Sequence, residues 1–174
     1  CANSFLTFTA CAFDSNQAQG RGGALESVFG SHIVLNTCSF TGNQAAEGGG
    51  LAALVNGSLE LVDCDIVGNY SSGSGSGVYA QSATVLSFAG CRFEGNDSPS
   101  GGCLYSSGSA TPVEVVDCRF IGNSTGCMPG GELIGAVMNA DPELSVSGSI
   151  FASNGNDHCF SLISADAGTI TGST

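Results

Sequence analysis

The feature that most constrains the fold is a six-residue phrase that recurs from one end of the chain to the other. It starts with cysteine (serine in the last copy), carries phenylalanine or isoleucine at its third position and ends with asparagine, in residues 11–16, 38–43, 64–69, 91–96, 118–123 and 149–154. Successive copies begin 27, 26, 27, 27 and 31 residues apart. A repeat of this length is typical of a solenoid, in which each turn buries its apolar face against its neighbours.

Each repeat contains short segments in which apolar and polar residues alternate, as they do in half-buried strands. One segment precedes the phrase, at 33–35, 59–61, 86–88, 113–115 and 144–146. The cysteine and the aromatic residue continue the inward face, because residues two apart on a strand share one side. After the asparagine and a polar loop, a glycine-rich step leads into another strand, at 22–25, 48–51, 75–78 and 101–104.

These elements predict an all-β fold, a right-handed parallel β-helix of about six rungs of 26–31 residues, as a single domain over residues 1–174. Glycine is expected at the bends, on the argument that only glycine turns this sharply and packs backbone closely without a Cβ clash. One internal column is expected to fill the cylinder: Phe13, Phe40, Ile66, Phe93, Phe120 and Phe151.

The chain is strongly acidic, and this excludes several classes of partner. It has 15 aspartates and glutamates against three arginines and no lysine, for a formal net charge of −12. Such a surface repels phosphate backbones, anionic lipid headgroups and acidic sugars, so no nucleic-acid partner is expected. No apolar run is long enough to span a membrane. Nine cysteines favour an oxidising compartment and predict an extracellular or cell-surface location.

The Phe-x-x-Asn phrase and the Gly-Gly-Ala-Leu segment at 22–25 together resemble the repeats of the chlamydial polymorphic outer-membrane proteins. They are also similar to right-handed β-helix proteins on bacterial and algal surfaces. The resemblance covers residues 5–163, and the chain departs from it by placing cysteine two positions before the core residue in five rungs. The resemblance implies a secreted, passenger-like surface module with no catalytic residues to carry over.

The most regular polar feature is the asparagine that ends each phrase. Three of these asparagines begin an N-x-[ST] sequon, but all six rungs keep the residue, so a stacked hydrogen-bonding ladder is the favoured interpretation. Asn56 lies off this column in an Asn-Gly-Ser turn and is the better glycan acceptor. The ladder comprises Asn16, Asn43, Asn69, Asn96, Asn123 and Asn154.

The cysteines form a second column, Cys11, Cys38, Cys64, Cys91 and Cys118, with Ser149 in the sixth rung. A vertical file of thiols offers no tetrahedral metal site, so no metal is predicted there. Free, buried thiols are favoured, and vertical disulfides between adjacent rungs stay open as the alternative. The pairing of Cys1, Cys103, Cys127 and Cys159 also stays open, with Cys103–Cys127 and Cys127–Cys159 as the candidate bridges.

Polysaccharide-cleaving chemistry has candidate residues, but no convergent site is expected. Asp63 and Asp117, with Asp65 nearby, could serve with Arg92 and Arg119 as the carboxylates and cations of a lyase. Asp63 and Asp117 lie two rungs apart, within the range of a glycosidase pair. However, these acidic residues alternate with buried ones as on any solvated strand face, and no long loops form a cleft.

The remaining polar residues suggest no cofactor. His32 and His158 are interpreted as solitary surface or turn residues. The loops around Asp97 and Asp157 lack the carboxylate spacing of a calcium loop, so neither a metal nor a cofactor is predicted.

The predicted function is therefore that of a non-enzymatic extracellular or cell-surface structural or adhesion module, whose flat sides contact protein or neutral glycan surfaces. The alternatives are a polysaccharide lyase or glycoside hydrolase of the β-helix type, and an accessory structural subunit of a large assembly. Strand-like residues at both ends, 6–8 and 169–171, lead us to expect a longer chain or end-on packing with other chains.

Overall fold

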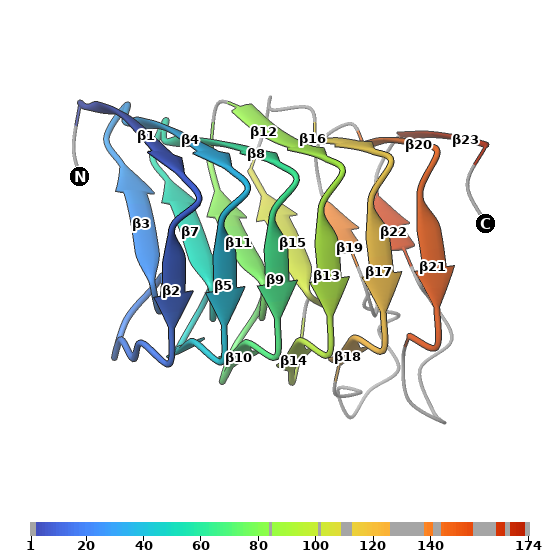
Figure 1. Cartoon of the computed structure of the whole chain (residues 1–174), viewed down its shortest axis with the longest axis horizontal. Helices are drawn as coiled ribbons and strands as arrows, with labels where there is room; N and C mark the ends of the chain where they lie inside the picture. The colour runs from blue at the N-terminus through green and yellow to red at the C-terminus, as the bar shows by residue number, and fades with distance from the viewer. Residues whose placement is uncertain are drawn as a thin grey trace.

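Every turn of the chain passes through the same succession of short strands and bends (Figure 1). The computed structural model describes residues 3–83, 85–100, 102–108, 113–125, 138–140, 144–154, 163–165 and 168–172. Over these residues the secondary structure consists of strands, with no helix. Strands of successive turns pair in parallel and in register, so the predicted all-β parallel β-helix is confirmed.

The strands form four parallel sheets, numbered in the order in which the chain visits them within a turn. Sheet 1 contains β1 (Phe5–Thr9), β4 (His32–Asn36), β8 (Ser58–Val62), β12 (Val85–Ala89), β16 (Val113–Val116), β20 (Leu144–Ser147) and β23 (Gly168–Thr171). Sheet 2 contains β2 (Ala12–Asp14), β5 (Ser39–Thr41), β9 (Asp65–Val67), β13 (Arg92–Glu94), β17 (Arg119–Ile121) and β21 (Ile150–Ala152).

Sheet 3 is the shortest and contains β6 (Gln44–Ala45), β10 (Tyr70–Ser71), β14 (Asp97–Ser98) and β18 (Ser124–Thr125). Sheet 4 contains β3 (Leu25–Val28), β7 (Leu51–Leu54), β11 (Val78–Gln81), β15 (Leu104–Ser107), β19 (Met138–Ala140) and β22 (Ile163–Ala165). In Figure 1, sheet 1 runs along the top, sheet 2 faces the viewer, sheet 4 lies behind it and sheet 3 lies at the bottom.

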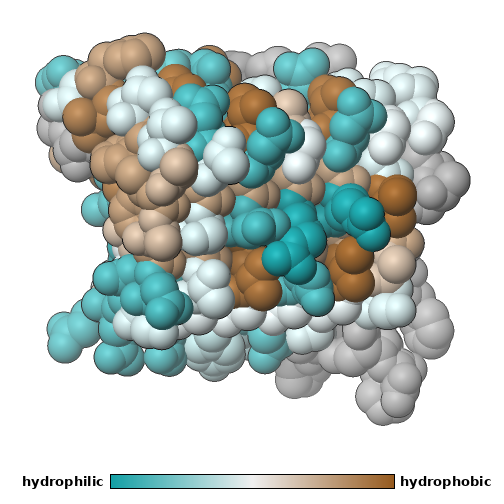
Figure 2. All heavy atoms as spheres, viewed as in Figure 1, coloured by the Kyte–Doolittle hydropathy of each residue, from teal (hydrophilic) through white to brown (hydrophobic). Residues whose placement is uncertain are grey.

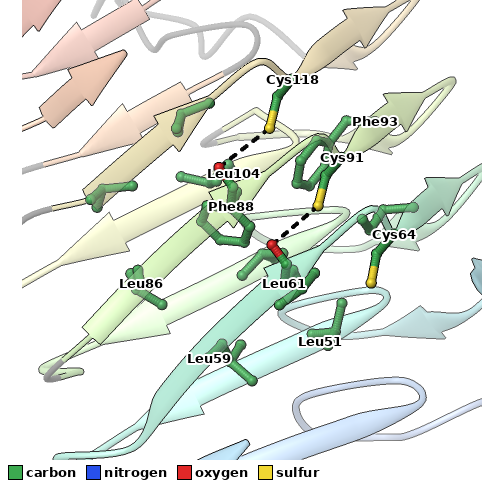
Figure 3. Packing of buried hydrophobic residues seen from close by; sticks show 14 of the residues in the cluster. Leu51, Leu59, Leu61, Cys64, Leu86, Phe88, Cys91, Phe93, Leu104 and Cys118 are labelled. Carbon is green, nitrogen blue, oxygen red and sulfur yellow. Dashed lines mark hydrogen bonds between the residues drawn. The ribbon is translucent and has the colours of Figure 1, made fainter. Parts of the chain in front are cut away.

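The core lies inside the coil and is built from the inward residues of sheets 1, 2 and 4. Strand β4 shows the pattern that produces it, since Ile33 and Leu35 are fully buried while the residues between and beside them are partly exposed. Figure 3 shows the result: leucines from sheets 1 and 4 point at the phenylalanines of the same interior. Burial of these side chains is the main stabilising term of the fold.

The internal aromatic column forms as two stacks separated by isoleucine. Phe13 and Phe40 stack with ring centroids 4.6 Å apart and planes within 3°. Phe93 and Phe120 stack at 4.7 Å, and Phe120 and Phe151 at 5.1 Å. Ile66 is fully buried between the two groups, in register with Phe40 and Phe93. Parallel pairing therefore places the third residue of every phrase directly beside its equivalents.

The bends differ from the expectation that only glycine forms them. The bend between sheets 1 and 2 uses a left-handed residue in every turn, and four of these residues are not glycine: Ala10, Thr37, Asp63 and Asp117, each with φ of 52°. Gly90 and Gly148 take the same place in the other two turns. The expectation was wrong for this bend, because a single left-handed residue is tolerated when turn-to-turn hydrogen bonds hold both sides.

Glycine is required where the bend before sheet 4 brings two backbones together. A Cβ on Gly49 would lie 2.4 Å from the Ser76 carbonyl oxygen and 2.5 Å from that of Tyr70. Both oxygens belong to the next turn, and that of Ser76 accepts a backbone hydrogen bond from Gly50, which limits its movement. The core pair of each phrase is therefore followed by glycines because the wall of the coil must pack against the neighbouring turn without side chains between.

Gly49→Ala is expected to lower the free energy of unfolding by about 1–3 kcal/mol, the range for overpacking a well-packed site. Gly20→Ala is the matched control, because a Cβ there meets nothing within 4 Å, and its effect should stay within about 0.5 kcal/mol. Chemical denaturation followed by circular dichroism measures both. Equal midpoints for the two variants would contradict the close approach at Gly49.

Candidate functional site

The asparagine column is a continuous internal ladder. Asn96 Nδ2 donates to the Ile66 carbonyl at 2.8 Å and to Asn123 Oδ1 at 2.9 Å. Its own Oδ1 accepts from the backbone N–H and the Nδ2 of Asn69, both at 3.0 Å. The other internal members repeat this pattern, and Asn43, Asn69, Asn96 and Asn123 are at most 1% exposed. Each side chain therefore satisfies both its own amide and the backbone of neighbouring turns.

Asn96→Ala is expected to lower the free energy of unfolding by about 2–4 kcal/mol, because it leaves several buried polar groups, among them the Asn69 N–H, without a partner. Asn36→Ala is a suitable control, since Asn36 lies on the partly exposed outer side of β4. The comparison is made by chemical denaturation. An Asn96→Ala midpoint equal to that of the control would show that the ladder contributes little.

The ladder also decides which asparagine could carry a glycan. The three ladder sequons begin at Asn69, Asn96 and Asn123, whose amide nitrogens are buried and already donate twice. Asn56 is exposed in the turn between β7 and β8, with φ of 63°. The site predicted from sequence therefore lies in an accessible turn.

Expressed through a glycosylating secretory pathway, the protein should carry sugar at Asn56 and not at Asn69, Asn96 or Asn123. Mass spectrometry after enzymatic deglycosylation reports each site separately, because released asparagine becomes aspartate. Asn56→Gln should abolish the mass shift. Modification at Asn96 in the folded protein would contradict the buried ladder.

The cysteine column lies at the start of the sheet 2 strands, at the opposite end from the ladder, and its members act as hydrogen-bonding groups. Cys11, Cys38, Cys64, Cys91 and Cys118 are free thiols, and the last four are at most 2% exposed. Cys91 and Cys118 donate S–H bonds of 3.5 Å to the Leu61 and Phe88 carbonyls of the preceding turn (Figure 3). Cys64 Sγ accepts from the Cys38 N–H at 3.4 Å, and Ser149 Oγ accepts from the Cys118 N–H at 3.1 Å. Serine replaces cysteine in the sixth rung by performing the same task.

The thiols titrate unequally because they contact one another. Hydrogen bonds with Cys118 and Cys64 raise the pKa of the Cys91 thiol, and burial raises it further. The same contacts with Cys91 lower the pKa of Cys64 and Cys118. Cys103 lies outside the column, and full burial raises the pKa of its thiol. Cys1, Cys127 and Cys159 fall outside the described residues, as do His158 and Asp157.

The residues expected of a polysaccharide-cleaving site come from three consecutive turns but hold separate positions. Asp63 and Asp117 lie in the left-handed bend between sheets 1 and 2, rather than on a strand face as expected. Each carboxylate packs against the glycine at the same bend of the next turn. A Cβ on Gly90 would lie 2.2 Å from Asp63 Oδ1, and a Cβ on Gly148 would lie 2.0 Å from Asp117 Oδ1. Sequence reasoning was therefore wrong about their setting.

The two arginines of that set lie side by side on the outer face of sheet 2. Arg92 donates from Nε to Asp65 Oδ1 at 2.8 Å and from a second nitrogen to Glu94. The bond to Asp65 raises the pKa of Arg92. Arg119 is exposed beside it. Figure 2 shows this hydrophilic group at the centre of the face, with hydrophobic residues next to it. The face is flat and its main cation is already neutralised by carboxylates.

A hollow that the sequence did not reveal lies over the bends leading into sheet 4. It has a volume of about 560 Å³ and is named here the Arg21 hollow; its lining residues are Gly20, Arg21, Glu26, Ala46, Glu47, Ser72 and Gly73. Arg21 Nε donates to Glu47 Oε2 at 2.8 Å, and this bond raises the pKa of Arg21. The two residues belong to adjacent turns and are also joined by a backbone bridge.

Two stacked tyrosines adjoin the hollow. Tyr79 and Tyr105 occupy equivalent outward positions of β11 and β15, with ring centroids 5.3 Å apart and planes within 8°. Burial, followed by the nearby Glu47 carboxylate, raises the pKa of Tyr79 to about 12, and its hydroxyl hydrogen-bonds that carboxylate. Tyr79 therefore stays a hydrogen-bond donor over the physiological pH range and fixes Glu47 together with Arg21.

The sequence around His32 suggested a solitary residue, but the structure gives it several contacts. Its ring contacts Ser58 and Glu60 from the next turn and stacks on Phe5 from the preceding one. The prediction failed because neighbours in this fold are 26 or 27 residues apart. The same spacing was the signal that could have found both this cluster and the Glu26–Ala52–Tyr79–Tyr105 column.

Within the described ranges, no group of three or more histidine, cysteine or acidic side chains is arranged to hold a metal ion. In the same part of the chain no helix is long and apolar enough to cross a membrane.

The fold and these faces define a parallel β-solenoid with surface sites on its outer sheets. Residues 2–167 match the family model described as the right handed beta helix region. The chain therefore belongs to the right-handed β-helix family, in agreement with the predicted handedness. No curated protein and no solved structure matches the chain.

Proposed function

We propose that the chain is an extracellular or cell-surface recognition module that binds neutral, hydroxyl-rich glycans at the Arg21 hollow without cleaving them. The single observation that carries the proposal is the Arg21–Glu47 pair in the lining of the hollow, held in place by the hydroxyl of the buried Tyr79. Planar polar side chains of this kind recognise sugars by hydrogen-bonding their hydroxyl groups. The repeats' similarity to those of chlamydial polymorphic outer-membrane proteins supports the surface location.

The polar groups of the hollow suit a neutral ligand. Glu47 uses one oxygen for Arg21, and the guanidinium retains further N–H donors. Glu26 adds a second carboxylate to the lining. Two carboxylates against one arginine leave the hollow negative, and the chain as a whole carries −12. Acidic sugars are therefore disfavoured, whereas hydroxyl groups can both donate to Glu47 and accept from Arg21.

The binding pair is held before any ligand arrives. Glu47 is restrained by Arg21, by the Tyr79 hydroxyl and by its own backbone bridge. A preorganised site loses less conformational entropy on binding, which raises affinity for a given set of contacts. The rigid wall of the solenoid thus supports recognition at its surface.

A panel of immobilised neutral and acidic oligosaccharides tests the proposal. The protein should bind neutral members, and Arg21→Ala should weaken that binding about tenfold, as expected for loss of a hydrogen bond from a charged donor. Arg119→Ala is the matched control, because Arg119 is exposed on sheet 2 and away from the hollow. Thermal unfolding should be similar for both, since exposed ion pairs contribute little to stability.

Two results would overturn the proposal. Unchanged glycan binding by Arg21→Ala would place recognition elsewhere. Measurable turnover of pectin, alginate or a neutral glycan that disappears in Asp117→Asn would favour the alternative of a polysaccharide lyase or hydrolase.

A further inference from the structure

A serine, a histidine and a glutamate meet on the outer face of sheet 1, on the side of the solenoid formed by β4 and β8. His32 and Ser58 are register partners in these adjacent strands, and Glu60 follows Ser58 by two residues on the same face. His32 Nδ1 lies 2.7 Å from Ser58 Oγ, and His32 Nε2 lies 3.1 Å from Glu60 Oε1. One imidazole therefore bridges a hydroxyl and a carboxylate.

The bonding pattern assigns the proton on the ring. Glu60 is an acceptor, so the neutral imidazole carries its hydrogen on Nε2 and donates it to Glu60. Nδ1 then presents its lone pair to the Ser58 hydroxyl at 2.7 Å, closer than the other acceptor of that hydroxyl, the Ser31 carbonyl at 3.4 Å. Phe5 stacks on the ring at 4.8 Å with planes within 17°, which holds its orientation. A hydroxyl, a base and a group that orients the base are the parts of an activated nucleophile.

Apolar residues flank the serine in the same row of the sheet. The outward side chains of this row are Phe5, His32, Ser58 and Val85, one from each of four consecutive turns. Phe5 is 70% exposed and Val85 is 40% exposed, while Ser58 between His32 and Val85 is 4% exposed. A reactant that approaches Ser58 Oγ from the Val85 side meets apolar surface. An uncharged ester with a short apolar acyl group fits this approach.

We propose that Ser58 is a nucleophile toward such esters, with His32 as its general base and Glu60 as the positioning residue. Ser58 Oγ forms a bond to the acyl carbon while its proton passes to His32 Nδ1. The C–O bond to the alcohol then breaks, and the departing alkoxide takes that proton from His32. Water, deprotonated by His32, hydrolyses the acyl-serine, releases the carboxylic acid and restores the serine.

The backbone sets the expected rate. The Ser58 N–H donates to the Ser31 carbonyl at 2.9 Å and the Gly57 N–H to the Leu54 carbonyl at 3.1 Å. Neither amide is free to stabilise the oxyanion, and such donors are a large part of efficient acyl transfer. The site should therefore react with activated esters and phosphonylating reagents, and only slowly with unactivated ones. None of its residues lines the Arg21 hollow, so this activity is independent of the proposed glycan binding.

The test uses a fluorophosphonate probe on the full chain produced in a host that adds no glycans. Attack by Ser58 Oγ forms the O–P bond and expels fluoride, and peptide mass spectrometry locates the label. Ser58 should be labelled, and p-nitrophenyl acetate should be hydrolysed faster than by buffer. Ser58→Ala should abolish both signals. His32→Ala should slow labelling about 100-fold, the lower range for loss of a general base.

Matched variants separate chemistry from structure. Ser145→Ala should change nothing, because Ser145 is exposed on the same sheet and faces Glu114 and Thr169 in register. Val85→Ala should speed labelling by uncovering Ser58. Glu60→Gln should lower the maximal labelling rate, and it should change the probe concentration that gives half-maximal rate much less. Glu60→Asp should restore part of the maximal rate. Circular dichroism and thermal unfolding confirm that each variant is folded.

Absence of label on Ser58 in the folded wild-type protein would overturn the proposal, leaving the cluster as a structural hydrogen-bond network. Equal labelling of Ser58 and Ser145, or labelling of Ser58 that His32→Ala does not slow, would also overturn it, because either result shows that the hydroxyl is not activated.

Discussion

The asparagine ladder and the parallel pairing of turns keep equivalent residues of successive turns in register, and the other features depend on that register. Each internal asparagine ties its own turn to the turns on both sides, so that equivalent residues become direct neighbours. Extended polar ladders of this kind are favourable only when every member is satisfied. The described part of the ladder meets that condition from Asn43 to Asn123. At the other end of the sheet 2 strands, Cys64 and Ser149 also join turns by accepting backbone N–H bonds.

Because equivalent residues of adjacent turns are direct neighbours, the choice of residue in one turn depends on the turns beside it. Inside, this favours like beside like: phenylalanine stacks on phenylalanine, and asparagine bonds to asparagine. Outside, opposite charges from adjacent turns form ion pairs, Arg92 with Asp65 and Arg21 with Glu47. With so few cations in an acidic chain, these pairs mark places where two turns are held together at the surface.

The period and the alternation within it were enough to predict the class of fold, the inward column and the asparagine ladder, because each depends only on which residues recur at equal spacing. The outer sites were harder. His32 was interpreted from its neighbours along the chain, whereas its contacts are Ser58 and Glu60 in the next turn. The Arg21 hollow depends on how side chains cross loops whose course no pattern specifies. The left-handed bends at Thr37 and Asp63 were missed because these residue types rarely adopt positive φ on their own. Hydrogen bonds to the neighbouring turns hold them in that conformation.

Variation within a column distinguishes the surfaces proposed to bind or react with ligands from those that hold the fold. The inward position of sheet 2 is Phe or Ile in every turn, since any polar residue would lie in the core. The outward row of sheet 4 changes from Glu26 through Ala52 to Tyr79. The equivalent row of sheet 1 passes from Phe5 through His32 to Ser58. Stacking alone does not require such sequences of unlike residues, and the row of sheet 1 brings His32 and Ser58 within hydrogen-bonding distance. A solenoid with an invariant interior thus gains distinct sites by changing single outward residues from turn to turn.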